Sequence, residues 1–277
     1  MRYFDAHNHL QDSRWGLDPS VLLSDVAGLG IERMVVNGSC ESDWPAVARL
    51  AEKFPDQVVA SFGYHPWYVH ERSSDYLDTL TGFLDAFPSA LGEIGLDRWK
   101  PDLDYAGQEE VFVAQLALAA ERQLPVSIHC LQAWGRLHDL LRISRRPDVG
   151  FLLHSFGGPV EMVRPLARLG AFFSFPGYFA NERKLRQRET FRQIPLDRLL
   201  VETDAPDQPL PPHLTQVECH DPATGKPLNH PANLVAVYTF LAGWLNQPLE
   251  VLAAQVETNF NRLFGPVMNR RNRIKDS

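Results

Sequence analysis

Asp5, His7 and His9 occupy alternate positions near the start of the chain, in the sequence Asp5-Ala6-His7-Asn8-His9. Successive side chains of a β-strand point to opposite faces, so these three residues would share one face. Two imidazoles about 7 Å apart along a strand can turn toward one divalent cation, because imidazole nitrogen is a common metal ligand. So short a motif also arises by chance, and a pair of polar residues at the end of a strand is the structural alternative.

Four further candidate ligands each follow an apolar run: Glu93, His129, His154 and Asp204. Glu93 lies in an otherwise apolar segment, and burying a lone carboxylate is costly unless it is paired or bound to metal. A single histidine of this kind is more often a hydrogen-bonded core residue than a ligand. Four histidines and two carboxylates at the ends of five apolar runs nevertheless predict one metal centre. Mixed imidazole and carboxylate ligands suit Zn, Mn, Co or Fe better than Mg.

Apolar runs alternate with helical patterns along most of the chain. Alternation of buried strands with helices of about 10 to 15 residues is typical of βαβ units and a parallel sheet. Eight such units close into a barrel, in which catalytic groups sit where the strands end. We therefore predict an α/β fold, a (β/α)8 TIM barrel. An open doubly wound sheet is the alternative, but it gives no reason for six strands to deliver ligands to one place. The predicted strands are residues 3–10, 31–38, 58–66, 90–97, 124–130, 149–158, 170–176 and 198–206, and the predicted helices are residues 19–29, 44–54, 74–87, 105–123, 133–144, 159–169 and 181–193.

The last part of the chain predicts one additional helix. Apolar residues recur at helical spacing from Leu249 to Leu263, so residues 248–264 should form an amphipathic C-terminal helix packed on the barrel. We predict a single domain over residues 1–265 and a polar C-terminal tail over residues 266–277. The proline-rich segment 206–231 is too long for an ordinary connection, and loops of that length are usually functional or disordered.

The composition narrows the class of protein. The chain has 277 residues and a net charge of -7, which argues against a broad basic face that grips long duplexes. Its three cysteines lie far apart and form no paired motif, which suits a reducing compartment. No apolar stretch is long enough for a membrane span, and the N-terminus does not resemble a signal peptide. We expect a cytoplasmic protein without a membrane association or an obligate protein partner, as a monomer or weak oligomer.

Several motifs, taken together, resemble the TatD family of metal-dependent deoxyribonucleases within the amidohydrolase superfamily. The resemblance spans nearly the whole chain. It extends to Gly63-Tyr64-His65-Pro66, to the segment 108–116, to Pro231-Ala232-Asn233-Leu234 and to the segment 259–265. The motifs that contain the candidate ligands are Asp5-Ala6-His7-Asn8-His9, Gly92-Glu93-Ile94-Gly95-Leu96-Asp97, Pro125-Val126-Ser127-Ile128-His129, Leu153-His154-Ser155-Phe156-Gly157-Gly158 and Glu202-Thr203-Asp204-Ala205-Pro206.

The resemblance implies a two-metal centre. In this arrangement His7, His9 and Asp204 hold one divalent ion, His129 and His154 hold the other, and Glu93 bridges the two. It also implies that water activated between the metals cleaves phosphodiester bonds of single-stranded DNA or short oligonucleotides. Six protein ligands exceed what a single open catalytic cation ordinarily takes, which agrees with two ions.

The chain departs from the family pattern around the expected substrate rim. Ser155-Phe156-Gly157-Gly158-Pro159 stands where the family commonly has Cys-Phe-Ser-Gly-Ser, and Leu228-Asn229-His230-Pro231 stands where Arg-Asn-Glu-Pro is frequent. The segment 207–226 is specific to this chain or its subgroup. These changes spare the candidate ligands but alter the residues expected to contact the substrate. An amide, lactone or other ester hydrolase with the same metal core is therefore an alternative, and a non-catalytic metal-stabilised scaffold is a second.

Three residues receive individual roles. Asp204 is expected to be both a ligand and the catalytic base that takes the proton of the attacking water. His65 is either a packed turn residue or, as we favour, a donor to a substrate oxygen. Asp5 is expected to orient a ligating imidazole without binding the metal itself. Trp67, Trp99 and Tyr178 are candidate platforms on which a base could stack.

Overall fold

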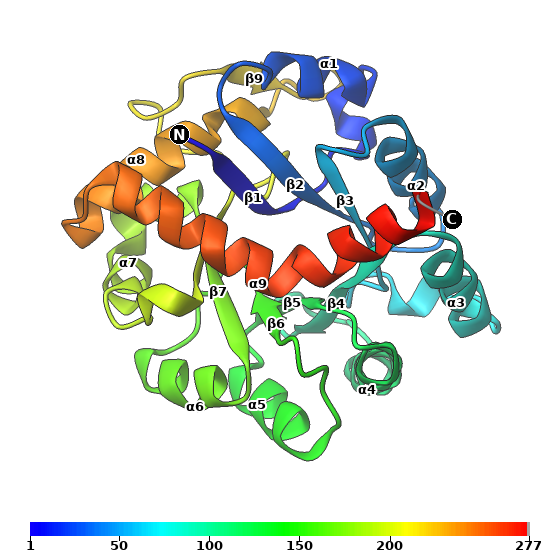
Figure 1. Cartoon of the computed structure of the whole chain (residues 1–277). Helices are drawn as coiled ribbons and strands as arrows, with labels where there is room; N and C mark the ends of the chain where they lie inside the picture. Colours follow the sequence, from blue (N-terminus) through cyan, green and yellow to red (C-terminus); the bar gives the residue numbers. More distant parts are fainter. Residues whose placement is uncertain (276–277) are drawn as a thin grey trace.

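The computed structural model describes the backbone of residues 1–275 and the side chains of residues 1–270. Eight strands form one sheet in the order β1 to β8, and every neighbouring pair in this order is parallel (Figure 1). The predicted (β/α)8 barrel is therefore confirmed, with a strand at each predicted range; β4 begins one residue before its range and β5 ends one residue after its range. The strands are β1 (Tyr3–Asn8), β2 (Ile31–Asn37), β3 (Val58–Phe62), β4 (Ser89–Asp97), β5 (Val126–Leu131), β6 (Phe151–Leu153), β7 (Ala171–Pro176) and β8 (Leu199–Glu202).

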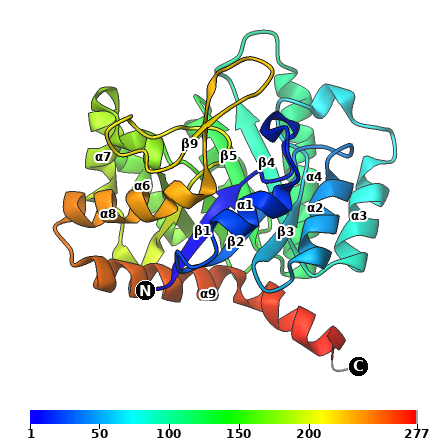
Figure 2. The same ribbon diagram turned by 90° about the horizontal axis from the view of Figure 1, so that it is seen from above.

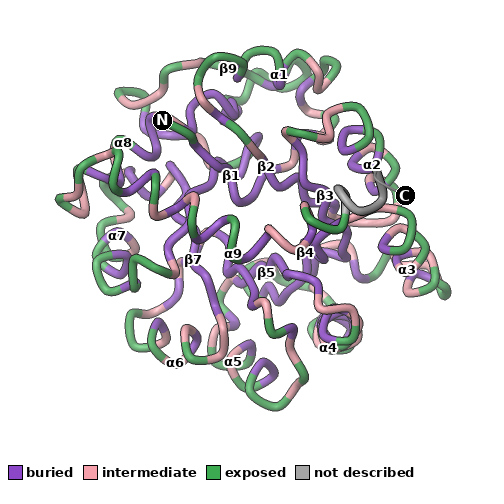
Figure 3. Tube along the Cα trace, in the orientation of Figure 1, coloured by how far each residue is buried: buried purple, intermediate pink, exposed green. Residues whose placement is uncertain are grey.

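Helices surround the strands, which lie buried at the centre of the molecule (Figure 3). A helix is present in every predicted range, and each is somewhat shorter than predicted, three of them by four residues or more. The first ends at Asp25, and Gly28 and Gly30 follow with φ of 81° and 77°, a conformation that cannot continue a right-handed helix. Short 3-10 turns, η3 (Val160–Met162) and η5 (Glu182–Lys184), replace the starts of the last two. The helices are α1 (Pro19–Asp25), α2 (Trp44–Lys53), α3 (Tyr76–Ala86), α4 (Tyr105–Arg122), α5 (Trp134–Ile143), α6 (Val163–Arg168) and α7 (Leu185–Phe191).

Two further helices complete the chain. Helix α8 (Leu234–Leu245) was not among the predicted elements. Helix α9 (Leu249–Lys275) crosses the barrel at the end where the strands begin, and it packs Phe260 against Phe4 of β1 with ring centres 4.9 Å apart (Figure 2). The predicted C-terminal helix is confirmed, but it continues past Phe264 to Lys275 through the polar segment. Residues 276 and 277 of the predicted tail lie outside the described residues.

Strands β1 and β8 meet at a seam that holds the mouth of the barrel together. The amide of His9 donates to the carbonyl of Ala205 at 2.7 Å, and the amide of Asp204 donates to the carbonyl of His7 at 3.0 Å. Near the start of β1, the buried hydroxyl of Tyr238 on α8 accepts from the amide of Phe4 at 3.1 Å and donates to its carbonyl at 2.9 Å. The seam therefore places candidate ligands from the first and last strands side by side.

The long segment between β8 and α8 is folded against the mouth of the barrel. It contains a small antiparallel hairpin of β9 (Glu218–His220) and β10 (Pro227–Asn229). Figure 2 shows this segment at the end of the barrel opposite α9. The same segment carries Asn233 at its end, whose side chain accepts from the amides of Gln216 and Val217 at 2.9 Å each. No helix in the described part of the chain is long and apolar enough to cross a membrane.

Candidate metal centre

A first cluster of ligand atoms forms where β1, β4 and β8 end. The Nε2 atoms of His7 and His9 lie 3.3 Å apart, and each is 3.3 Å from Oε2 of Glu93. Oδ1 of Asp204 lies 3.6 Å from Nε2 of His7 and 3.7 Å from Nε2 of His9. All four residues were predicted ligands, and the structure brings them together.

A second cluster gathers around the other oxygen of Glu93. Oε1 of Glu93 lies 2.8 Å from Nε2 of His154, 3.2 Å from Nδ1 of His129 and 3.5 Å from Nε2 of His65. Nδ1 of His129 and Nε2 of His154 are 3.2 Å apart. One oxygen of the same carboxylate thus faces each cluster, which is the geometry a bridging ligand needs.

Close strand contact makes this arrangement possible. Gly95 of β4 has φ of 152°, and a Cβ atom there would collide with the backbone carbonyl of His129 on β5. A glycine lets the two strands approach closely at the level of the clusters. The glycines that flank Glu93 therefore do what the sequence predicted, since they bring other groups close to its carboxylate.

In each imidazole of the centre, one nitrogen faces Glu93 (the inner nitrogen) and the other faces away from it (the outer nitrogen). The hydrogen bond of the outer nitrogen determines whether the inner nitrogen has a free lone pair. Nδ1 of His9 lies 2.8 Å from the carbonyl oxygen of Asn37, which can only accept, so Nδ1 carries the proton. Nε2 of His129 lies 2.9 Å from Oδ2 of Asp97, and this nitrogen likewise donates to the ionised carboxylate. In the neutral rings, Nε2 of His9 and Nδ1 of His129 therefore direct lone pairs at the oxygens of Glu93.

Lone pairs that face carboxylate oxygens repel unless protons or cations lie between them. The inner nitrogens and carboxylate oxygens form three groups of potential metal ligands within the described residues: His7, His9 and Asp204; His7, Glu93 and His154; and His65, Glu93 and His129. A carboxylate that holds the outer nitrogen of a ligating histidine is the usual arrangement around metal sites. The donor set of this chain therefore fits divalent cations.

His65 differs from the other histidines of the centre. Its Nδ1 accepts a hydrogen bond from the backbone amide of Trp67 at 3.1 Å, so in this arrangement the proton of the ring is on Nε2. That N–H group is directed toward Glu93 and the second cluster. A nitrogen that carries a proton cannot ligate a metal, which supports the predicted role of His65 as a hydrogen-bond donor.

Burial and charge shift the pKa values of the centre in opposite directions. Burial raises the pKa of Asp204 to about 7 and lowers the pKa of His7 to about 4. Burial also acts on Glu93, but the charges of its imidazole neighbours outweigh it and hold the pKa of that carboxyl well below its usual range. Burial alone would lower the pKa of His9, but its hydrogen bond to Glu93 and the charges of Glu93, Asp204 and Asp207 together outweigh burial and raise the pKa to about 9.

Among the described residues, Asp5 forms hydrogen bonds to the backbone of His7 and to Thr203 and none to an imidazole ring, so its expected role as an orienting partner of a ring stays a prediction. Its Oδ1 accepts from the backbone amides of His7 at 3.2 Å and Thr203 at 3.0 Å, and its Oδ2 accepts from the hydroxyl of Thr203 at 2.5 Å. The outer nitrogen of His7 instead lies 2.9 Å from the hydroxyl of Ser127. Asp5 therefore acts on the backbone of β1 and β8, where it fixes the seam beneath the ligands.

Three residues that the sequence analysis left without a role also belong to the centre. Asp97 bonds to His129 as described above, and Glu202 accepts from the amide and hydroxyl of Ser155 at 2.7 and 2.5 Å. Strand alternation carried a signal for both, because Asp97 shares a face with Glu93 and Glu202 shares a face with Asp204. Gln208, which contacts Asp204, lies in a loop where no periodicity could indicate it.

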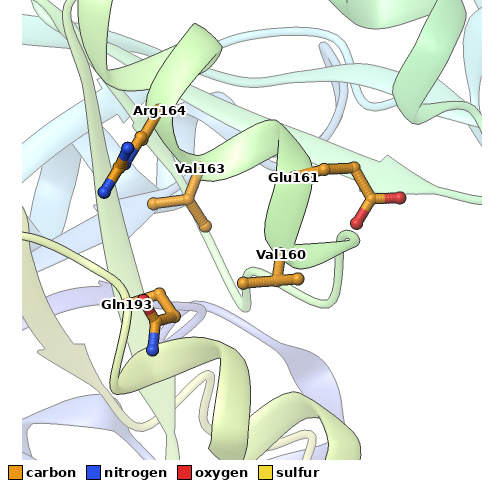
Figure 4. A pocket seen from close by; sticks show the side chains of 5 residues that line it. All are labelled: Val160, Glu161, Val163, Arg164 and Gln193. Carbon is orange, nitrogen blue, oxygen red and sulfur yellow. The ribbon is translucent and has the colours of Figure 1, made fainter.

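A separate surface pocket lies beside η3 and α6. Val160, Glu161, Val163, Arg164 and Gln193 line it (Figure 4). None of the candidate ligands lines this pocket, and its residues offer one carboxylate and no imidazole. It is therefore not part of the metal centre.

Comparisons with known proteins agree with this geometry. The family model described as TatD related DNase matches residues 4–265. A protein of Pantoea sp. strain At-9b named 3'-5' ssDNA/RNA exonuclease TatD is 31% identical over 263 residues, which cover 94% of this chain and 98% of that protein. A Klebsiella pneumoniae protein of the same name is 32% identical over 273 residues, which cover 96% and 99%.

A solved structure is similar over the same length. The crystal structure of YjjV, a TatD homologue of Escherichia coli K12, superimposes with a TM-score of 0.85 at 27% identity and covers 95% of this chain and 98% of that one. The predicted family resemblance and the predicted class of metal-dependent hydrolase are thereby confirmed. The chain belongs to the TatD-related DNase family.

Proposed function

We propose that this protein hydrolyses phosphodiester bonds of single-stranded DNA or RNA with two divalent cations bound in the metal centre. The observation that carries the proposal is that the two carboxylate oxygens of Glu93 face different clusters. Its Oε2 faces His7 and His9, while its Oε1 faces His129 and His154. The relatives of 31% and 32% identity are named as exonucleases of single strands, which supports this substrate class and a 3'-5' direction.

The residues of the centre would share the two ions. His7, His9 and Asp204 hold one ion, and His129 and His154 hold the other, with Glu93 between them. Zn, Mn, Co or Fe fit these mixed ligands better than Mg. Such cations polarise a phosphoryl oxygen and make a water molecule more acidic, which is the chemistry that phosphodiester hydrolysis requires.

The protein's own side chains supply orientation and proton transfer. The Nε2–H group of His65 donates to a non-bridging oxygen of the phosphate and helps to hold it in line for attack. The Asp204 carboxylate, whose Oδ1 faces His7 and His9 at the first cluster, takes the proton from the attacking water. Asp97 holds the imidazole of His129 in one tautomer throughout.

The proposal is tested with metal-depleted protein that is reloaded separately with each of the four metals. A single-stranded oligonucleotide labelled at its 5' end should be shortened stepwise from its 3' end, and Asp204→Asn and Glu93→Gln should each abolish most of this activity. Asp56→Asn, an exposed carboxylate before β3, is the matched control and should cleave like the wild type. Absence of cleavage with every metal, together with turnover of a lactone or an amide, would overturn the proposal in favour of that hydrolase class.

A further inference from the structure

Asp97 connects the metal centre to two tryptophans at the mouth of the barrel. Its Oδ2 lies 2.9 Å from Nε2 of His129 and accepts from the indole nitrogen of Trp67 at 2.7 Å. Its Oδ1 accepts from the backbone amide of Trp99 at 2.7 Å. The carboxylate that orients a candidate metal ligand therefore also fixes one indole and the backbone of the next tryptophan.

Lys100 places a positive charge beside this arrangement. Its Nζ lies 3.2 Å from the centre of the Trp67 ring, a cation–π contact that holds the half-buried side chain against the indole. The same indole stands edge-on to His65 and His129, with ring centres 5.0 and 6.2 Å away. Among the described residues Lys100 forms no ion pair, so its charge can pair with an anionic ligand beside the metal centre. The protein as a whole is acidic.

Trp99 leaves a large apolar surface in solvent at the same edge. Its side chain follows β4 directly and 58% of the residue is exposed, although Asp97 anchors its backbone. Exposing an indole forgoes the stabilisation that its burial would bring. An indole this exposed, on a backbone anchored to Asp97, provides apolar surface for a flat ligand.

We propose that Trp67, Trp99 and Lys100 form a nucleotide subsite on the His129 side of the metal centre. Lys100 pairs with the phosphate that neighbours the scissile one, and a base of the same strand stacks on Trp99. The inference rests on the proposed phosphodiesterase function and deepens it. Stacking on an exposed indole requires an unpaired base, so the subsite selects single strands over duplexes.

The first test compares two substrates in the metal-loaded enzyme. An oligonucleotide has neighbouring bases and phosphates, whereas methyl 4-nitrophenyl phosphate has one phosphodiester and no base. Trp99→Ala should lower the ratio of kcat/KM for the oligonucleotide to that for the small diester by roughly 5- to 150-fold, mostly through the KM of the oligonucleotide. Trp99→Phe, which keeps a π-face, should restore most of the ratio.

The second test measures the contribution of the Lys100 charge from the salt dependence of oligonucleotide affinity. Because each phosphate contact on a single strand contributes a slope of about 0.7 in log affinity against log salt, Lys100→Met should reduce the slope by about that amount. Lys53→Met, on the outer face of α2, should leave the slope unchanged. An unchanged ratio in Trp99→Ala, or an unchanged slope in Lys100→Met, overturns the subsite while the nuclease function stands.

Binding without turnover separates this inference from the proposed function. Metal-stripped protein is titrated with a fluorescent single-stranded oligonucleotide, and its anisotropy is followed for the wild type, Trp99→Ala and Lys100→Met. Weaker binding by both variants supports the subsite even if the wild type cleaves no phosphodiester, in which case only the proposed function fails. Equal binding by all three proteins overturns the subsite.

Discussion

The side-chain amide of Gln208 donates to Oδ2 of Asp204 at 2.5 Å. The same nitrogen donates to the hydroxyl of Ser155 at 2.5 Å, and that hydroxyl donates to Oε1 of Glu202 at 2.5 Å. Oε1 of Glu202 lies 3.7 Å from Nδ1 of His154, so the hydrogen bonds of one loop glutamine run from the candidate ligand Asp204 to a carboxylate beside the candidate ligand His154. With Oδ2 of Asp204 held in this way, Oδ1 is the oxygen that faces His7 and His9.

We predict that Gln208→Met weakens metal binding and lowers kcat/KM, each by roughly 10- to 100-fold. Methionine keeps the length of the side chain but removes both donors, and a hydrogen bond to a charged group contributes about 1.5–3 kcal/mol. Gln208→Glu should lower metal affinity and kcat/KM further, because it places a second carboxylate against Asp204. The check is a metal titration with a competing chelator, with Gln193→Met as an exposed control. If Gln208→Met binds metal as tightly as the wild type, the hydrogen bond from Gln208 does not orient Asp204 for metal binding.

We predict that Asp97→Asn reduces metal affinity by about 10- to 100-fold, which is the usual cost of removing a partner of a ligating histidine. Burial raises the pKa of Asp97, but the hydrogen bond and charge of His129 together with the hydrogen bonds from Trp99 and Trp67 outweigh burial and lower the pKa to about 2, so the carboxylate is ionised at neutral pH. An asparagine cannot accept from both His129 and Trp67 through the same charged oxygen. Asp102→Asn, in the following loop, is the matched control. Equal metal contents of the two variants after dialysis would contradict the prediction.

The sequence predicted the ligands because their signal is local. His7 and His9 alternate at the end of one strand, while Glu93, His129 and Asp204 lie in or just after other apolar strands of the barrel, so topology brings these candidate ligands to one mouth. The same reasoning could have included Asp97 and Glu202, which share strand faces with predicted ligands. Their roles were missed because an acidic residue at a strand end is equally typical of a turn or a cap.

Other features depend on tertiary contacts that a single sequence does not reveal. Helix α8 is apolar on nearly all sides, so the amphipathic period that indicates a surface helix is absent from Leu234–Leu245. In α9 the chain continues through Pro266 with Val267 buried, although polar residues follow. Gln208 contacts Asp204 from a long loop, and Asp5 bonds to Thr203 across the seam, a contact that only barrel closure creates.

We predict that metal affinity rises steeply with pH up to about 7 and with a lower slope from about 7 to 9. A cation binds the ionised Asp204 and neutral His9, whose pKa values are raised to about 7 and about 9 in the metal-free protein. At the first cluster, binding between these values must release the proton of His9, and below 7 it must also release that of Asp204. His129 and His154, whose pKa values are also raised, release further protons when the second cluster binds a cation. Calorimetry in buffers of different ionisation enthalpy counts these protons. His70→Gln, an exposed histidine, should give the wild-type profile, and affinity independent of pH would refute the assignment.

We predict that Tyr238→Phe destabilises the fold by about 1–3 kcal/mol. The variant keeps the ring but leaves the buried amide and carbonyl of Phe4 without the hydroxyl that bonds to both, and unpaired buried groups cost about this much. Tyr3→Phe is the matched control, because that hydroxyl contacts only the sulfur of Met1 at 3.6 Å and should contribute at most about 0.5 kcal/mol. Urea unfolding measures both free energies. Equal midpoints for the two variants would contradict the prediction, whereas a lower midpoint for Tyr238→Phe alone would show that its hydroxyl stabilises β1 through the backbone of Phe4.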